Sequence, residues 1–280
     1  MCRWCVEHTA RKVWYLEPSN HQLGTINRLQ RFWDWHIDMG ILYGTIDDIS
    51  QKKKPWRFPK KNFFNFYAKR IHGGQVVASL EEALRILELS LDIYLTYCSC
   101  RHSTHSEHPK LYKCLLLNND AEQARRWDAK MKIKGKPSIG TFIDPEEAQE
   151  IIVNSRKEEG CFQTVLWKWP PRVACLCNCD QYCASWWAPE ITWGQLPSFK
   201  RSKVVMADNC DMCGICVSYC HKKALSLDEQ GPLIEEEKCL GCGLCVDNCP
   251  QNVFELEPCE VIFDRQIGKV VDLHSELRNG

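Results

Sequence analysis

Two groups of four cysteines near the C-terminus share one spacing, and the second group starts 29 residues after the first. Each group reads Cys-x2-Cys-x2-Cys-x3-Cys, and the members are Cys210, Cys213, Cys216 and Cys220, then Cys239, Cys242, Cys245 and Cys249. Three cysteines on one tight loop can each present a thiolate to a corner of an iron–sulfur cubane, whereas the fourth thiolate must come from elsewhere in the fold. Because the spacing occurs twice, each half can complete the cluster of the other.

The residues around these cysteines repeat as well. Gly214 corresponds to Gly243, and Val217 corresponds to Val246. Agreement at positions that are not ligands indicates an internal repeat. Zinc sites or disulfides are the alternative use of eight cysteines. Zinc sites, however, rarely need two interleaved copies of a pattern with three ligands on a loop and one remote ligand.

Over residues 201–257 this pattern resembles the bacterial dicluster ferredoxin family, whose fold is a small α+β sandwich with pseudo-twofold symmetry. The resemblance implies two [4Fe-4S] clusters, each completed by the last cysteine of the other copy. The implied ligands are Cys210, Cys213, Cys216 and Cys249 for cluster 1, and Cys239, Cys242, Cys245 and Cys220 for cluster 2. The first copy has His221 where the family has proline, as the second copy does at Pro250. This position shapes the backbone and is not a ligand.

A second cysteine-rich region precedes the repeat and holds Cys98, Cys100, Cys114, Cys161, Cys175, Cys177, Cys179 and Cys183. Alternate residues of an extended segment face the same side, so Cys98 with Cys100, or the cysteines at 175, 177 and 179, can point at one metal centre. We expect at least one additional [4Fe-4S] cluster here. Three of its ligands would be Cys98, Cys100 and Cys114, with the fourth drawn from residues 175–183. The number of thiols also permits a second additional cluster.

Charged and ionisable residues follow Cys100 directly. Arg101 would offset the negative charge of a thiolate-bound cluster and raise its potential. His102, His105 and His108 can act as metal ligands or as a proton relay, but their polar loop favours exposed side chains. A structural zinc site or unliganded core cysteines are the alternatives for the central region. Its layout is similar to that of uncharacterised iron–sulfur proteins of anaerobes.

Composition limits the classes of partner. Lys plus Arg and Asp plus Glu balance at 36 each among 280 residues, so no global field favours nucleic acid or an anionic membrane. No apolar run is long enough to span a bilayer, and the N-terminus lacks the apolar core of a signal peptide. We therefore expect a soluble, cytoplasmic protein. Its 19 cysteines fit reduced thiolates that hold iron in an anaerobic or well-reduced cytoplasm.

Three helices and one strand can be predicted between the N-terminal segment and the repeat. A capping box at Ser79 opens an amphipathic helix whose apolar positions run from Leu80 to Leu95. Residues 120–134 form a charged helix, and a third helix begins after Asp144 and ends at Gly160. The residues from 163 to 166 are typical of a strand.

The expected fold class is α+β, with a C-terminal pseudo-twofold ferredoxin-like domain appended to a Cys-rich and Trp-rich mixed α/β region. The boundaries divide an aromatic-rich segment (1–72), the Cys-rich region (73–200), the dicluster domain (201–257) and a tail (258–280) in which a hairpin is one option. A basic stretch at 52–61 is interleaved with aromatic residues, but its two prolines favour a solvated loop, which makes nucleic acid an unlikely partner.

The chemistry of these cysteines favours an electron-transfer protein, a subunit or dedicated partner of an anaerobic oxidoreductase complex. Single-electron transfer needs no residue acting as acid or base, so no catalytic residue is assigned. One alternative is an iron–sulfur enzyme with a substrate-binding cluster between Cys98 and Cys183. Another is an iron–sulfur sensor or assembly factor. Motifs for covalent haem, for dinucleotides and for nucleoside triphosphates are absent from the sequence.

Overall fold

The computed structural model describes residues 14–16, 18–21, 72–98, 101, 112–133, 135, 138–168, 172–180, 198–199, 202–206, 209–236, 238–258, 261–264 and 269–272. Cys100, Cys183, the three predicted loop histidines and the basic stretch at 52–61 lie outside the described residues. None of the helices within these ranges has the length and apolar character needed to cross a bilayer.

A seven-stranded sheet forms the central unit (residues 72–199), in the strand order β4-β2-β3-β6-β5-β1-β7. The strands are β1 (His72–Ala78), β2 (Ile93–Tyr97), β3 (Tyr112–Leu117), β4 (Gly140–Ile143), β5 (Phe162–Lys168), β6 (Arg172–Cys179) and β7 (Ser198–Phe199). Every neighbouring pair is antiparallel except β1 and β7. Successive side chains of a strand point to opposite faces of the sheet, so the position of a residue along its strand decides which face it lines.

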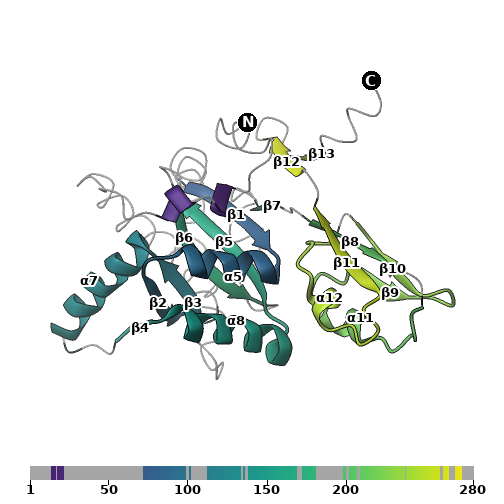
Figure 1. Ribbon diagram of the computed structural model, residues 1–280, viewed down its shortest axis with the longest axis horizontal. Helices are drawn as coiled ribbons and strands as arrows, with labels where there is room; N and C mark the ends of the chain where they lie inside the picture. The colour runs from purple at the N-terminus through teal and green to yellow at the C-terminus, as the bar shows by residue number, and fades with distance from the viewer. Residues whose placement is uncertain are drawn as a thin grey trace, which may run out of the picture.

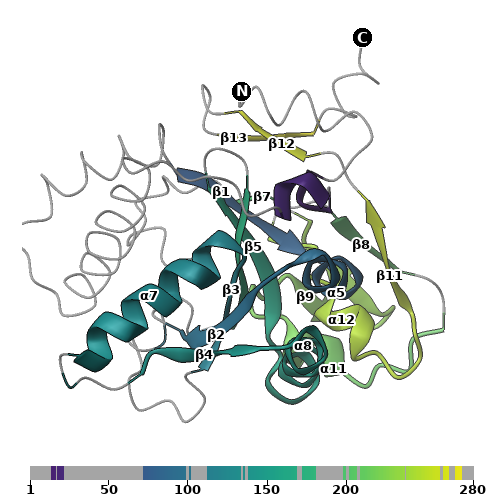
Figure 2. The same cartoon turned by 60° about the vertical axis from the view of Figure 1, so that its left-hand side comes forward.

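Helices α5 (Leu80–Leu89) and α8 (Pro145–Glu159) pack beside each other against the sheet, as Figures 1 and 2 show. The core between them contains Leu115, Leu117, Val165 and Leu176, all 0% exposed. These residues come from β3, β5 and β6 and share one face of the sheet. The short 3₁₀ helices Trp14–Leu16 and Pro18–His21 precede the unit, and α7 (Asn119–Ile133) follows β3.

The predicted caps are present at the helix ends. Ser79 Oγ accepts a hydrogen bond from the Glu82 amide at 3.1 Å, and the Glu82 carboxylate accepts one from the Ser79 amide at 3.1 Å. Asp144 accepts from the Glu147 amide at 2.7 Å, and α8 ends at Gly160 in the left-handed conformation, with φ 62°. The predicted strand at 163–166 lies within β5, and the predicted charged helix corresponds to α7.

The first predicted helix is shorter than its apolar pattern indicated. It ends at Leu89, and Tyr94 and Leu95 lie on β2 instead. Ser90 terminates the helix, because its amide bonds to the Leu87 carbonyl at 3.1 Å and its hydroxyl to the Ile86 carbonyl at 2.8 Å. The β-branched and aromatic residues that follow favour a strand, whose pairing with β3 and β4 outweighs helical periodicity.

The C-terminal unit (residues 202–258) is built from two small antiparallel sheets and two short helices (Figure 1). One sheet pairs β8 (Ser202–Met206) with β11 (Phe254–Pro258), and the other pairs β9 (Leu225–Leu227) with β10 (Pro232–Ile234). The helices are α11 (Ile215–Tyr219) and α12 (Leu244–Asp247). They follow Gly214 and Gly243, which both have φ 76°, so the sequence repeat is also a repeat of backbone conformation. A hairpin of β12 (Val261–Asp264) and β13 (Lys269–Asp272) follows.

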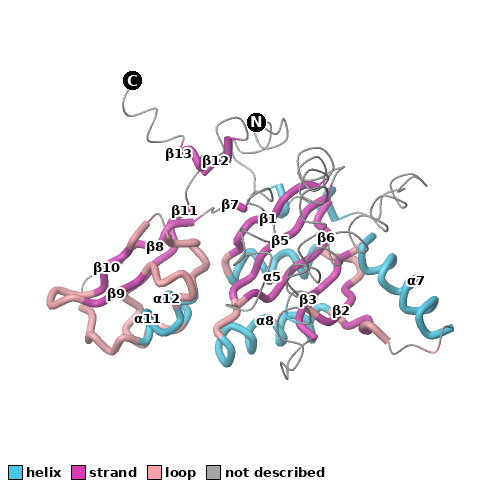
Figure 3. Tube along the Cα trace, turned by 180° about the vertical axis from the view of Figure 1, so that it is seen from behind, coloured by secondary structure: helices cyan, strands magenta, loops and turns pink. Residues whose placement is uncertain are grey.

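Hydrogen bonds join the two units where α8 ends, and Figure 3 shows α11 and α12 on the side of the C-terminal unit that faces the central sheet. The Tyr219 hydroxyl donates to the Lys157 carbonyl at 3.0 Å. His221 Nε2 donates to the carbonyl of Gly160 at 2.6 Å. The residue that replaces the family's proline therefore contacts the central unit.

Candidate iron–sulfur centres

The C-terminal unit gathers its cysteines into two groups, and each group mixes the two copies of the repeat. The outer group consists of Cys210, Cys213, Cys216 and Cys249, whose thiols are close enough to influence one another electrostatically. Cys213 is exposed, whereas Cys216 is 6% exposed. The outer group therefore opens to the surface at one corner.

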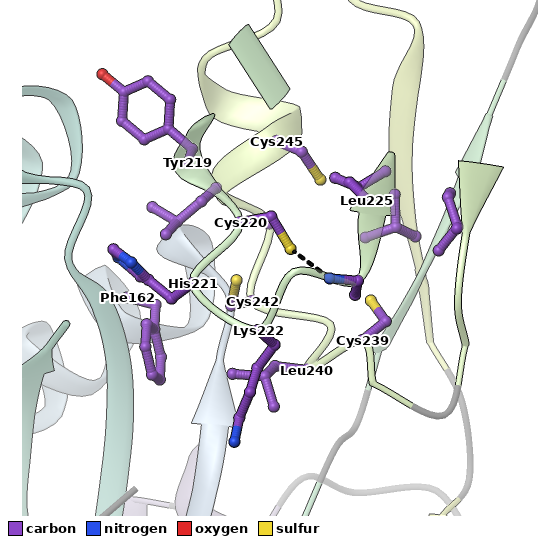
Figure 4. Close-up of a pocket in the computed structure, with 15 residues that line it drawn as sticks. Phe162, Tyr219, Cys220, His221, Lys222, Leu225, Cys239, Leu240, Cys242 and Cys245 are labelled. Carbon is purple, nitrogen blue, oxygen red and sulfur yellow. Dashed lines mark hydrogen bonds between the residues drawn. The ribbon is translucent and has the colours of Figure 1, made fainter. Parts of the chain in front are cut away.

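The inner group consists of Cys220, Cys239, Cys242 and Cys245, which line one pocket. Figure 4 shows the four sulfur atoms facing a common space, with Phe162 of β5 and His221 at its side. Phe162 is fully buried and belongs to the central unit. The inner group thus lies against the central sheet, whereas the outer group does not.

Backbone amides approach the sulfur atoms at equivalent positions of the two copies. The Met212 amide donates to Cys210 Sγ at 3.4 Å, and the Gly241 amide donates to Cys239 Sγ at 3.4 Å. The Ala224 amide donates to Cys220 Sγ at 3.2 Å, which is the dashed line in Figure 4. Hydrogen bonds of this kind stabilise the negative charge of a thiolate.

Both tight turns require positive φ, 61° at Met212 and 64° at Gly241. The first copy accommodates a methionine in this conformation, so positive φ alone does not require glycine there. A Cβ atom on Gly241 would lie 1.8 Å from the Ser202 carbonyl oxygen. Glycine is therefore needed in the second copy because β8 passes directly over the cysteine loop.

Burial makes the inner thiols difficult to ionise on their own. It raises the pKa of Cys242 to about 11 and raises the pKa of Cys245 further, and the neighbouring thiols add to the effect at Cys245. Arg156 acts in the opposite direction at Cys242. Thiolates at these positions need a nearby positive charge, and iron ligated by all four would supply it. The donor set therefore fits a cluster.

Arg156 places a positive charge between the two units. Its side chain is 1% exposed, although it extends from α8. The guanidinium donates to the Cys242 carbonyl at 2.8 Å, to Asp247 of α12 at 2.5 Å and to Gln163 of β5 at 2.5 Å. Nothing in the sequence around Arg156 distinguishes it from the exposed cations of an amphipathic helix, and sequence reasoning missed it.

The central sheet gathers further thiols on the face opposite α5 and α8, the face on which α7 packs beside Leu116. The alternate positions Cys175, Cys177 and Cys179 of β6 share one face, and Cys114 of β3 is paired with Cys177. The sulfur atoms of Cys175 and Cys177 are 3.3 Å apart. Contact with Cys114 favours ionisation of Cys177, but the contact with Cys175 and burial together raise its pKa to about 12.

Cys98 joins this face from the end of β2. It is 2% exposed and packs in one buried cluster with Cys114, Cys177, Cys179 and Phe162. The same cluster extends into the C-terminal unit through residues of its cysteine loop and helices, namely Tyr219, Leu240, Cys242 and Leu244. The central thiols and the inner group are therefore parts of one packed region.

Cys161 and Arg101 form a separate arrangement. Arg101 is fully buried and donates to Cys161 Sγ at 3.2 Å and to Asp180 at 2.5 Å. The sequence predicted that Arg101 offsets negative charge at the central cysteines. In the structure Arg101 contacts Cys161, the residue directly before β5. Burial raises the pKa of the Cys161 thiol, and the nearby cations Lys113 and Arg101 partly oppose that effect.

None of the described cysteines is joined in a disulfide, so the disulfide alternative is not realised among them. Within the described ranges, no three or more His, Cys, Asp or Glu side chains are arranged to hold a single metal ion. The dicluster cysteines are likewise too far apart to bind one ion together, because a cubane separates its thiolates more widely than a single ion does. A single-ion geometry is thus no guide to cluster sites.

The paired thiol groups and their repeated loops define an iron–sulfur binding unit. Residues 209–258 match the family model of the 4Fe-4S dicluster domain. This part of the chain is a dicluster ferredoxin segment and binds [4Fe-4S] clusters. No curated protein and no solved structure matches the chain.

Proposed function

We propose that this protein is an electron carrier that passes single electrons between an external redox partner and its own central unit. One observation carries the proposal: the two cysteine groups of the dicluster segment are not equivalent in position. Cys213 of the outer group is exposed, whereas no cysteine of the inner group is, and Phe162 of the central unit lines the inner pocket. The segment therefore has one side at which electrons can enter and another side that faces the central unit.

We assign one cluster to the outer group, with Cys210, Cys213, Cys216 and Cys249 as ligands, and the other to the inner group, with Cys239, Cys242, Cys245 and Cys220. The donor chemistry supports this assignment, because four soft thiolates and surrounding backbone amides suit iron–sulfur ligation. Bound clusters supply reversible one-electron chemistry over a wide range of potentials. The chain holds the sulfur atoms and donates backbone hydrogen bonds to the ligands.

The partner would dock beside the outer group. Met212 lies on the outer cysteine loop with 41% of its surface exposed, next to the exposed Cys213. A flexible thioether can pack against differently shaped partner surfaces. Bound clusters supply electron transfer alone, and this function needs no catalytic acid or base. We therefore propose an oxidoreductase, or another subunit of such a complex, as the partner.

The test uses the full chain purified without oxygen and two matched single variants, Cys213→Ser and Cys239→Ser. We expect about four of the dicluster iron atoms to be lost in each variant, with the loss of a different electron paramagnetic resonance signal in each. Electron uptake from a low-potential donor protein should slow more in Cys213→Ser. Loss of both signals in both variants, with a folded chain by circular dichroism, would contradict the assignment. Equal uptake rates would contradict entry at the outer group.

A further inference from the structure

The central sheet brings more thiols together than packing alone requires. Five cysteines from three adjacent strands meet on the face that α5 and α8 leave uncovered, namely Cys98, Cys114, Cys175, Cys177 and Cys179. The opposite face of the same strands is aliphatic, with Leu115, Leu117 and Leu176 in the core. A buried cysteine behaves as a small apolar residue, but Leu or Val would fill such a face more densely.

We propose that Cys98, Cys114, Cys177 and Cys179 hold a third [4Fe-4S] cluster next to the inner group of the dicluster segment. These four cysteines share one buried cluster of side chains with Phe162, and that cluster also contains Cys242 of the inner group. Cys177 and Cys179 lie on β6. Cys114 lies on β3, and Cys98 directly follows β2. Cys98 and Cys114 were also expected as ligands from the sequence, whereas the third expected ligand, Cys100, lies outside the described residues.

The other described central thiols do not belong to this buried cluster of side chains. Cys175 is one step further along β6 and its Sγ lies 3.3 Å from that of Cys177, but it is outside the cluster of side chains that contacts the C-terminal unit. Cys161 contacts Arg101, whose guanidinium also bonds to Asp180. Cys175 is therefore the nearest alternative ligand, a buried cysteine on the same strand and face, and its substitution is the sharpest test of the proposed set.

Phe162 lies at the boundary between the proposed third site and the inner group. It packs against Cys98 and Cys179 and also lines the inner pocket. Transfer of one electron between the two sites would break no bond and move no proton, and the apolar contact keeps the intervening space free of water. The role of the third site as electron acceptor rests on the proposed function, whereas the presence of its iron does not.

Iron and acid-labile sulfide in the anaerobically purified full chain test the proposal. Three clusters require about twelve iron atoms and no zinc, and Mössbauer spectra of the unaltered chain should resolve three cubanes. About eight iron atoms with two clusters would overturn the third site and leave the proposed function intact. Stoichiometric zinc would also overturn it.

Single substitutions test the ligand set. Cys114→Ser and Cys177→Ser should each reduce iron from about twelve to about eight per chain, while both dicluster signals persist as an internal check of folding. Cys175→Ser should retain all the iron. Equal loss in Cys175→Ser, or full retention in Cys177→Ser, would overturn the assignment. If Cys114→Ser fails to fold, the Mössbauer count of the unaltered chain still decides whether a third cluster exists.

Discussion

Arg156 connects a helix of the central unit to the cysteine loop of the inner group. It is held by three partners at once, the Cys242 carbonyl, Asp247 and Gln163, and is therefore fixed in orientation. A positive charge close to an iron–sulfur cluster favours the reduced and more negative state, which raises the reduction potential. The central unit would thus contribute to the electronic properties of a site whose proposed ligands all belong to the other unit.

Replacing Arg156 by Gln should lower the reduction potential of the inner cluster selectively. Loss of an interaction of roughly 1–2 kcal/mol at an effective dielectric constant of about 20 corresponds to about 40–90 mV for one electron. Arg156→Lys keeps the charge and should shift the potential less. A potentiometric titration followed by electron paramagnetic resonance measures both clusters together, so the outer cluster serves as the reference. A shift of equal size in both clusters would contradict a local effect of Arg156.

At the scale of elements, the sequence predicts those features that depend on near neighbours. Ser79, Asp144 and Gly160 mark helix ends because capping involves residues within one turn, and the cysteine spacing indicates cluster loops for the same reason. Tyr94 and Leu95 were misplaced because their strand is stabilised by β3 and β4, which are distant in sequence. The packing of Cys98 against the C-terminal unit likewise depends on tertiary contacts and has no local signal.

The second 3₁₀ helix packs against the end of α5 through a buried histidine. His21 is 1% exposed, bonds through Nε2 to the Tyr15 carbonyl at 2.8 Å and lies 3.4 Å from Ser90 Oγ through Nδ1. Burial lowers the pKa of His21 below its usual value of 6.5, and the hydrogen bond to Tyr15 only partly offsets this effect. The folded chain therefore favours the neutral ring.

Stability should consequently fall as the pH drops through about 6.5, where the unfolded chain begins to bind a proton that the folded chain does not. The decline should stop below the lower pKa of the folded state, where both states are protonated. A His21→Gln variant should lack this part of the pH dependence. Thermal unfolding of both proteins at about pH 8 and pH 5.5 measures the difference. Parallel declines in the two proteins would assign the pH dependence to other groups.

On the scale of the whole molecule, the outer cysteine group has an exposed member, Cys213, whereas the inner group lies beside Phe162 of the central unit. The hydrophobic contact around Phe162 and the hydrogen bonds from Tyr219 and His221 fix this orientation. Solvent access to the two clusters should differ accordingly. Access matters for function, because exposure influences both the potential of a cluster and its resistance to oxidants.

Exposure to ferricyanide with an iron chelator should destroy the outer cluster several-fold faster than the inner one. The time course of the two resonance signals provides the measurement. Phe162→Leu, which keeps an apolar side chain but shortens it, should accelerate loss of the inner cluster and leave the outer rate unchanged. Loss of the inner cluster first would show that the central unit does not protect it.

The two copies of the internal repeat differ at His221, and this difference determines which copy contacts the central unit. Two copies with matching loop conformations present two similar surfaces, and a unit built from them could attach to its neighbour in either of two ways. The copies differ at the residue after the fourth cysteine, where one has His221, bonded to Gly160 of the central unit, and the other has the exposed Pro250. A proline ring has no donor for that carbonyl. This departure from the repeat, together with Tyr219 where the other copy has Asn248, therefore gives the molecule a polarity, and a swap of His221 and Pro250 should weaken it.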